Sequence, residues 1–411
     1  MRYLEKDDAE IAALVKKEDE RIENTLNLIA AENHSPRSIM EVLGSILNTK
    51  TIEGYPGKRF HAGCTHVDEI ENLAIARGKA LFGAEHINVQ PHSGTSANLA
   101  VYFSVLDVGD RVLSMGLPYG GHLSHGHRAS ITSKCFNFSH YSVDPETERI
   151  DYDEIRDLAG KLKPKMIVAG ASSYPRLIDY ARIAEIAKEV SACVFADMAH
   201  LAGLVAAKVI PSPVPHCDFV TFTTYKTMMG GRGGVALCRK EYGKKIDSAV
   251  FPGCQGTSAV NQIAAKALIF KLAGEPHFID LQKKTLENAV RLAEALQSRG
   301  YRVVSGGTDN HQVLVDLSTK GITGKAAENI LESVGIVVNR NVIPQDAKTP
   351  GRVSGLRLGS AGITARGMGK SEIIRIADLM DTALGKDVDA DTIARVATAV
   401  EELCQRFPVY V

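Results

Sequence analysis

The chain has 411 residues, of which 45% are hydrophobic and 23% are charged, and Lys plus Arg equal Asp plus Glu at 48 each. This composition excludes a disordered chain, and the balanced charge argues against nucleic acid or an anionic membrane as a partner. No segment reaches the about eighteen apolar residues of a spanning helix, and residues 1–10 lack the features of a signal peptide. The seven cysteines form no CxxC pair, which favours reduced thiols, no metal site and a cytoplasmic location.

The chain begins with a predicted helical arm over residues 1–30, because apolar residues recur at helical spacing between residues 7 and 30. A repeating pattern of short apolar strands and helices follows. Strands are expected at residues 87–89, 111–115, 165–171, 193–196, 219–223 and 235–238, and helices at 97–106 and 180–190 separate some of them. This alternation predicts an α/β domain over residues 31–275, with a large, mostly parallel sheet covered by helices on both faces.

The pattern changes near residue 275, where Gly274 and Pro276 interrupt a helix. Helices are then expected at residues 279–299, 325–334, 371–384 and 392–406, and strands at 311–317 and 336–343. We interpret residues 276–411 as a smaller C-terminal α+β domain. Ligands of parallel sheets bind outside the carboxyl ends of the strands, so polar motifs at the predicted strand ends carry the most functional weight.

Two of these motifs can be explained either by structure or by ligand binding. In the turn over residues 90–97, Ser93, Thr95 and backbone N–H groups at a helix start suit a phosphate, but the same residues are also good helix caps. Asp197 directly ends an apolar strand, where a carboxylate needs a partner. That partner is either a helix N-terminus or the N–H group of a pyridinium ring.

The third motif surrounds Lys226. A lone lysine after a strand is usually solvated, but Lys226 follows hydroxyl residues and precedes a glycine-rich turn that contains Arg232. Burial beside another cation lowers the pKa of a lysine and allows it to form a Schiff base. A ligand with a phosphate, a pyridinium ring and an aldehyde needs all three motifs. The sequence therefore predicts an enzyme that binds pyridoxal 5′-phosphate through Lys226.

Several long motifs resemble those of serine hydroxymethyltransferases, in the same order and over almost the whole chain. They include residues 28–33 (LIAAEN), 53–59 (EGYPGKR), 88–94 (NVQPHSG), 120–126 (GGHLSHG), 197–207 (DMAHLAGLVAA) and 354–357 (SGLR). The resemblance implies a fold-type I, aminotransferase-like enzyme that makes or breaks the Cα–Cβ bond of serine or a related β-hydroxy amino acid. It also implies tetrahydrofolate as one-carbon acceptor, and active sites shared between the subunits of a homodimer, which could pair into a tetramer.

The resemblance assigns roles to residues where the motifs match. Lys226 is implied to bind the cofactor covalently, Asp197 to contact its pyridinium nitrogen, His200 to lie near its phenolic oxygen and His122 to lie on its ring face. The implied phosphate contacts are Ser93, Gly94 and Thr95, together with Gly256 of the partner subunit. Ser172 and Thr223 are implied to lie nearby. The implied substrate and folate contacts are Arg357 at the carboxylate, Glu53 as the proton-transfer group, and Leu117, Gly121, Leu123 and Asn341 around the pterin. We expect His125 to be an ordinary loop or core histidine.

Several positions around this pocket depart from the family's usual residues. Thr51 and His61 each stand for a tyrosine, and Tyr225 stands for a histidine beside the lysine. The other departures are Ala31 for serine, Thr95-Ser96 for Ser-Gln, Tyr119 for histidine and Thr257 for glycine. The volume lost at Thr51 leaves room at Cα, so the alternative function is a folate-independent α-methylserine or threonine-type aldolase or transaldolase. A transaminase or a non-catalytic cofactor-binding protein fits these motifs less well.

Overall fold

The computed structural model describes residues 2–348, 351 and 353–410, and the chain divides into two compact units. The larger unit comprises residues 35–283 and 342–350, and the smaller comprises residues 1–34, 284–341 and 351–411. None of the described helices combines the length and the apolar character needed to cross a membrane.

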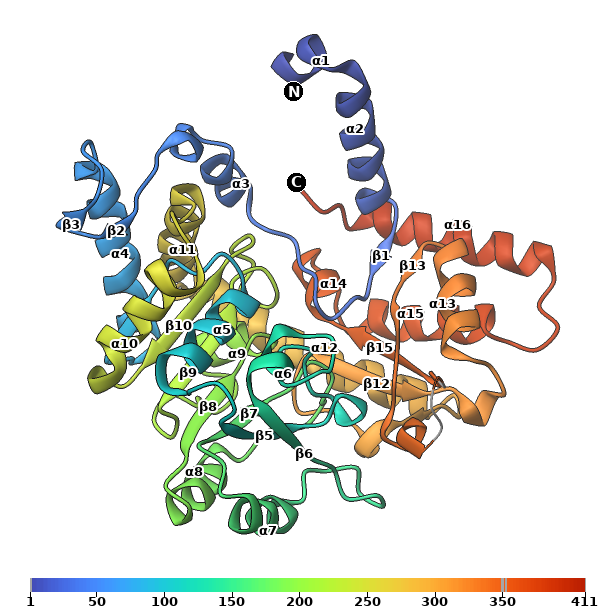
Figure 1. The fold of residues 1–411 in the computed structure, drawn as a ribbon. Helices are drawn as coiled ribbons and strands as arrows, with labels where there is room; N and C mark the ends of the chain where they lie inside the picture. The colour runs from blue at the N-terminus through green and yellow to red at the C-terminus, as the bar shows by residue number, and fades with distance from the viewer. Residues whose placement is uncertain (1, 349–350, 352, 411) are drawn as a thin grey trace. The chain divides into compact units, whose positions relative to one another are not determined.

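The larger unit is built on a seven-stranded sheet in the order β4-β10-β9-β8-β7-β5-β6 (Figure 1). Its strands are β4 His86–Asn88, β5 Arg111–Met115, β6 Asn137–Tyr141, β7 Met166–Gly170, β8 Cys193–Asp197, β9 Phe219–Thr223 and β10 Gly234–Cys238. Strands β5 to β9 are parallel, and β10 is antiparallel to both β9 and β4. The predicted α/β class with a mostly parallel sheet is confirmed. Strand β6 was not predicted, because its sequence, NFSHY, has no continuous apolar run.

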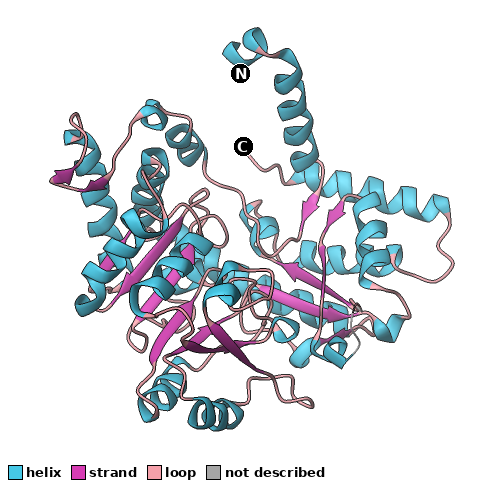
Figure 2. Ribbon diagram, in the orientation of Figure 1, coloured by secondary structure: helices cyan, strands magenta, loops and turns pink. Residues whose placement is uncertain are grey.

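Helices pack around the sheet of the larger unit, some against its strands and others against neighbouring helices (Figure 2). They are α3 Arg37–Leu43, α4 Thr65–Phe82, α5 Gly94–Val105, α6 Ile131–Cys135, α7 Tyr152–Leu162, α8 Tyr180–Glu189, α9 Ala202–Ala206, α10 Gly243–Ser248 and α11 Val260–Leu272. Helix α5 places Ala97 and Val101 in a buried cluster with Phe195 of β8 and Phe219 of β9. Because the apolar face of α5 is held against the sheet, the first turn of this helix is fixed beside the ends of β8 and β9.

The smaller unit contains a four-stranded antiparallel sheet in the order β11-β12-β15-β14 and a two-stranded parallel pair, β1-β13. The strands are β1 Leu26–Asn27, β11 Arg302–Val303, β12 Gln312–Asp316, β13 Ile336–Val337, β14 Asn339–Asn341 and β15 Gly355–Gly359. The helices are α1 Arg2–Asp7, α2 Ala9–Glu23, α13 Gly324–Ser333, α14 Ala361–Ala365, α15 Lys370–Ala383 and α16 Ala390–Arg406, with α12 Pro276–Gln297 crossing the boundary between the units.

Two predicted elements of the smaller unit differ in the structure. The helix predicted over residues 7–30 ends at Glu23, because the backbone of Leu26 and Leu28 donates to the carbonyls of Gly335 and Val337 instead of continuing the helix. This pairing also groups residues 1–34 with the C-terminal segments, where a separate N-terminal arm was expected. The strand predicted over residues 336–343 is divided into β13 and β14, which belong to different sheets.

Candidate active site

A pocket of about 230 Å³ lies at the carboxyl ends of the parallel strands in the larger unit. Its lining brings together residues that follow three successive strands and residues of the first turn of α5. They include Ser93, Gly94, Thr95, Asn98, His122, Ser172, Asp197, His200, Thr223, Tyr225, Lys226 and Arg232. The three motifs found at predicted strand ends therefore meet in one place.

The turn before α5 is stabilised by side chains that form hydrogen bonds with its backbone. The Ser93 hydroxyl accepts a hydrogen bond from Ser96 N at 3.2 Å, so Ser93 caps the helix as well as lining the pocket. Lys266, which is fully buried, donates from Nζ to the carbonyls of Val89 at 2.6 Å and Pro91 at 3.0 Å, and burial lowers its pKa to about 7. The turn thus presents the N–H groups of a helix start and two hydroxyl side chains, Ser93 and Thr95, to the pocket.

Replacing Gly234 with alanine tests how tightly this turn must close. A Cβ at Gly234 would lie 2.0 Å from the carbonyl oxygen of Ser93, so the turn must move. We expect the unfolding free energy to fall by about 1–3 kcal/mol and the affinity for pyridoxal phosphate to fall with it. Cofactor titration and thermal unfolding measure both effects. Gly160→Ala in α7 is the control, because its Cβ would meet nothing within 4 Å; equal behaviour of the two variants would contradict the prediction.

Asp197, at the end of β8, supplies the carboxylate among the residues that line the pocket. Its side chain is 8% exposed, and Oδ2 accepts from Asn98 Nδ2 at 2.8 Å and lies 3.0 Å from His125 Nε2. Oδ1 accepts from Ala199 N at 3.0 Å, which is a local turn contact and not a helix cap, because α9 begins at Ala202. Burial alone would raise the pKa of this carboxyl, but the hydrogen bond and charge of His125, the charge of His122 and the Asn98 contact together hold it well below its usual range.

Sequence reasoning missed two of the residues that orient Asp197. Asn98 lies on α5, and besides its bond to Asp197 it accepts from Thr221 Oγ1 at 2.5 Å. His125 was expected to be a loop or core histidine, and at 1% exposed it does lie in the core, but its contact with Asp197 at 3.0 Å was not foreseen. The spacing of His125 three residues after His122 was the available signal. His122, His125 and Asp197 also place one ligand atom each within 4.8 Å of one another, close enough for a metal ion.

Lys226 follows β9 and is 6% exposed. The turn after it is stabilised by the hydroxyls that precede it and follow it: Thr224 Oγ1 donates to Gly231 O at 2.8 Å, and Thr227 Oγ1 donates to His200 O at 2.9 Å. The chain after β8 and the chain after β9 are thereby tied together beside the lysine. A buried amine at a fixed position, close to a carboxylate and to helix N–H groups, suits covalent binding of a phosphorylated aldehyde.

Tyr225 stacks against a cation in this pocket. The Arg232 guanidinium carbon lies 4.5 Å above the centroid of the Tyr225 ring, and Lys226 Nζ lies 5.9 Å from the same centroid. The aromatic face therefore has two cations as neighbours.

Other predicted site residues of the larger unit lie outside this pocket. Glu53, Thr51, His61 and Gly256 are not among the residues that line it. They belong instead to the segment around the β2 Gly54–Tyr55 and β3 Lys58–Arg59 hairpin and to the turn after the kinked η4 Ala249–Cys254. These two segments contact each other, because Ile52 N donates to Thr257 Oγ1 at 2.8 Å.

The predicted folate and carboxylate contacts are distributed over both units. Leu117 and Leu123 are 39% and 53% exposed, whereas Gly121 is required by packing, because a Cβ there would lie 2.2 Å from the carbonyl oxygen of Met115. Arg357 and Asn341 belong to the smaller unit, where Arg357 on β15 donates from Nε to Asn339 Oδ1 at 3.1 Å. The planar guanidinium is thus oriented by a neighbouring strand.

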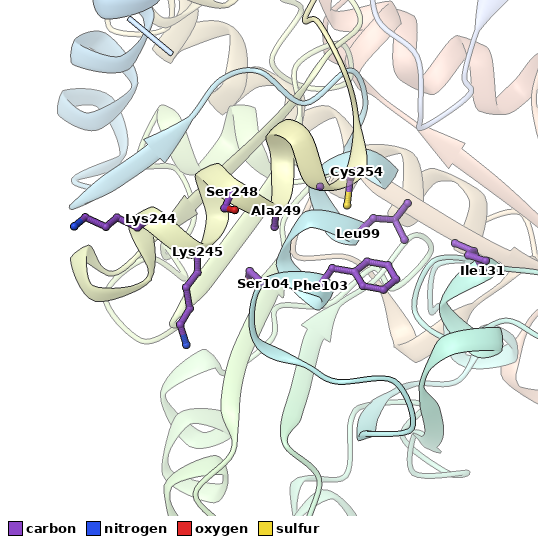
Figure 3. A pocket seen from close by; sticks show the side chains of 10 residues that line it. Leu99, Phe103, Ser104, Ile131, Lys244, Lys245, Ser248, Ala249 and Cys254 are labelled. Carbon is purple, nitrogen blue, oxygen red and sulfur yellow. The ribbon is translucent and has the colours of Figure 1, made fainter. Parts of the chain in front are cut away.

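A larger hollow of about 700 Å³ lies elsewhere in the larger unit, between α5, α6 and α10. Its lining includes Leu99, Phe103 and Ile131, while the amino groups of Lys244 and Lys245 extend away from these side chains (Figure 3). None of the residues in the three predicted motifs lines it. The smaller pocket is therefore the candidate active site.

A mostly parallel sheet that carries a buried lysine, an ionised aspartate and a turn suited to phosphate (residues 90–97) at the carboxyl ends of its strands defines a fold-type I pyridoxal-phosphate enzyme. The residues fit this cofactor: the helix start can accept a phosphate, Asp197 can pair with a ring N–H, and Lys226 can bind an aldehyde. The family model described as serine hydroxymethyltransferase matches residues 4–380 of the chain. The chain belongs to the serine hydroxymethyltransferase family, whose members are pyridoxal-phosphate-dependent transferases.

Proposed function

We propose that the protein is a hydroxymethyltransferase that cleaves or forms the Cα–Cβ bond of serine or a related β-hydroxy amino acid, with tetrahydrofolate as the one-carbon acceptor. The observation that supports this most strongly is the convergence of Lys226, Asp197 and the Ser93 turn on one pocket. Family membership supports the same reaction class. A cytoplasmic location is consistent with the seven free cysteines.

Each residue of the pocket has a distinct task in this proposal. Pyridoxal phosphate, when bound, supplies an electron sink for the bonding electrons of the cleaved bond. With the cofactor bound, the turn over residues 93–95 would hold its phosphate, Lys226 would hold its aldehyde carbon, and Asp197 would keep a proton on its ring nitrogen. His122 would lie against the ring. We assign His122, His125 and Asp197 to cofactor binding rather than to a metal ion, because Asp197 Oδ2 already contacts His125 and Asn98.

Two further residues complete the proposed chemistry. Arg357 binds the carboxylate of the amino acid through its planar guanidinium. Glu53 exchanges a proton with the β-hydroxyl, so that the oxygen becomes a carbonyl as the Cα–Cβ bond breaks. We propose that Glu53 and Gly256 act in the pocket of a second copy of the chain, in a homodimer or in a tetramer of two such dimers. This agrees with their position outside the pocket of their own chain.

Thr51, His61 and Tyr225 favour a second candidate, a folate-independent aldolase or transaldolase for α-methylserine or threonine. Threonine in place of a tyrosine frees volume, and tyrosine in place of a histidine puts a phenol ring that stacks with Arg232 beside Lys226. Both changes would alter which groups at Cα and Cβ are accepted. The two candidates share the cofactor and the bond that breaks, and they differ in substrate and in the need for folate.

Ligand-dependent spectra of the holoenzyme, together with turnover, separate the two candidates. Absorption of the bound cofactor is followed while glycine, D-alanine, L-serine, α-methyl-L-serine or L-threonine is added, with and without tetrahydrofolate. A folate-enhanced response to glycine together with rapid serine turnover is the expected result. A response to D-alanine or threonine that is indifferent to folate would establish the second candidate instead. No spectral change with any of these amino acids would contradict both.

A further inference from the structure

The Glu53 segment is anchored by its own hairpin on one side. Glu53 directly precedes β2, and its carbonyl accepts a hydrogen bond from Phe60 N at 3.1 Å. Gly54 has a φ of +91°, and a Cβ there would lie 2.3 Å from the carbonyl oxygen of Lys58. Only glycine fits this position without strain. The left-handed backbone conformation of Gly54 therefore restricts the path of the chain after Glu53.

Arg59 holds the carbonyls on both sides of Glu53. Its Nη1 donates to Ile52 O at 3.0 Å and to Gly54 O at 2.6 Å, and its side chain is 4% exposed. The other guanidinium nitrogens pair with Asp68 at 2.8 Å and Glu71 at 2.6 Å. Since every part of this buried cation has a partner, the guanidinium is a fixed point to which the Glu53 backbone is attached.

Glu71 connects the same hairpin to the strand that leads into the phosphate-type turn. Glu71, 1% exposed, accepts from Gln90 Nε2 at 2.8 Å, and Gln90 Nε2 also donates to Gly54 O at 3.0 Å. Ile52 N of the same segment donates to Thr257 Oγ1 at 2.8 Å. Thr257 is in turn joined to the turn, because its carbonyl lies 3.0 Å from His92 Nε2.

Thr257 differs from Arg59 and Gln90 in this hydrogen-bond network, because it binds a main-chain N–H group and they bind main-chain carbonyls. The main-chain carbonyls next to Glu53 are each held by side chains of the buried cluster, but Ile52 N is held by one hydroxyl from a distant part of the chain. The hydrogen bond to this amide therefore depends on the side chain at position 257.

We propose that Thr257 is a positioning residue: through Ile52 N it fixes the orientation in which the Glu53 carboxylate meets the β-hydroxyl of the substrate. The inference rests on the proposed role of Glu53 in the reaction. It holds whether Glu53 acts in its own pocket or in that of a second copy. A small displacement of a proton-transfer group lowers the rate strongly without altering how tightly the substrate binds.

Isosteric substitution of Thr257 in the holoenzyme tests the proposal. Thr257→Val keeps the shape and removes the acceptor, and Thr257→Ser keeps the hydroxyl. We expect the valine variant to lower kcat about tenfold with little change in KM, and the serine variant to restore kcat to within about twofold of the original. Hydrogen exchange at Ile52 N should quicken about fivefold in the valine variant and remain slow in the serine variant.

A double-mutant cycle with Glu53→Gln distinguishes positioning from a general structural effect. If Thr257 acts through Glu53, Thr257→Val adds no further loss of kcat in the Glu53→Gln background. An equal loss in both backgrounds, unchanged exchange at Ile52, or weakened cofactor binding as the sole effect would overturn the inference. Full turnover by Glu53→Gln would overturn the proposed role of Glu53 and the inference with it, whereas a slow Glu53→Gln beside a normal Thr257→Val would overturn the inference alone.

Discussion

Replacing Lys226 with glutamine is expected to abolish covalent binding of pyridoxal phosphate and to lower turnover by about a thousandfold or more. The side chain is buried at the end of β9, and no other lysine is among the residues that line the pocket. Glutamine keeps much of the length and polarity of lysine but has no nucleophilic amine. Borohydride reduction followed by peptide mass mapping measures the effect directly, because only a lysine-linked cofactor is retained as a phosphopyridoxyl group.

Lys188→Gln is the matched control for this experiment. Lys188 is exposed on α8 and does not line the pocket, so its substitution should leave both labelling and turnover unchanged. Thermal unfolding of each variant separates loss of the amine from loss of the fold. A phosphopyridoxyl label on any residue other than Lys226 in the original protein would show that the assignment of the cofactor lysine is wrong.

Replacing Asp197 with asparagine is expected to lower turnover by about a hundredfold to ten-thousandfold and to weaken cofactor binding. Asparagine has the same shape but no charge, so the ring nitrogen of the cofactor loses the group that keeps it protonated. In the original protein the pKa of Asp197 is held well below its usual range, so the carboxylate remains ionised throughout the neutral range. The effect is measured as kcat and as the cofactor dissociation constant.

Asp179→Asn provides the control for the charge change. Asp179 caps α8 through a hydrogen bond from Arg182 N at 3.0 Å and is not in the pocket. Asparagine caps helices about as well as aspartate, so this variant should behave like the original protein. Full turnover by Asp197→Asn would exclude a role for the carboxylate in supporting the cofactor ring.

Much of the fold follows from the sequence because the buried strands and amphipathic helices carry strong local signals. Strands β7, β8, β9 and β10 are buried along almost their whole length and consist mainly of apolar residues. Helix α12 shows its apolar stripe over six turns. Strand β6, with exposed and polar residues, and the pair β1-β13, with two residues per strand, have no such signal. Pairing with a distant segment, not local preference, determines these elements.

By itself the sequence determined the class of chemistry, because Lys226, Asp197 and the Ser93 turn each follow a predicted strand and such strands end at one edge of a sheet. Only the tertiary structure decided how these groups are supported. Asn98 and His125 reach Asp197 across sequence separations of 99 and 72 residues, and Thr257 reaches Ile52 across 205. Hydrogen bonds between side chains depend on distances of a few ångströms, and chain crossovers set those distances in ways that no local pattern encodes.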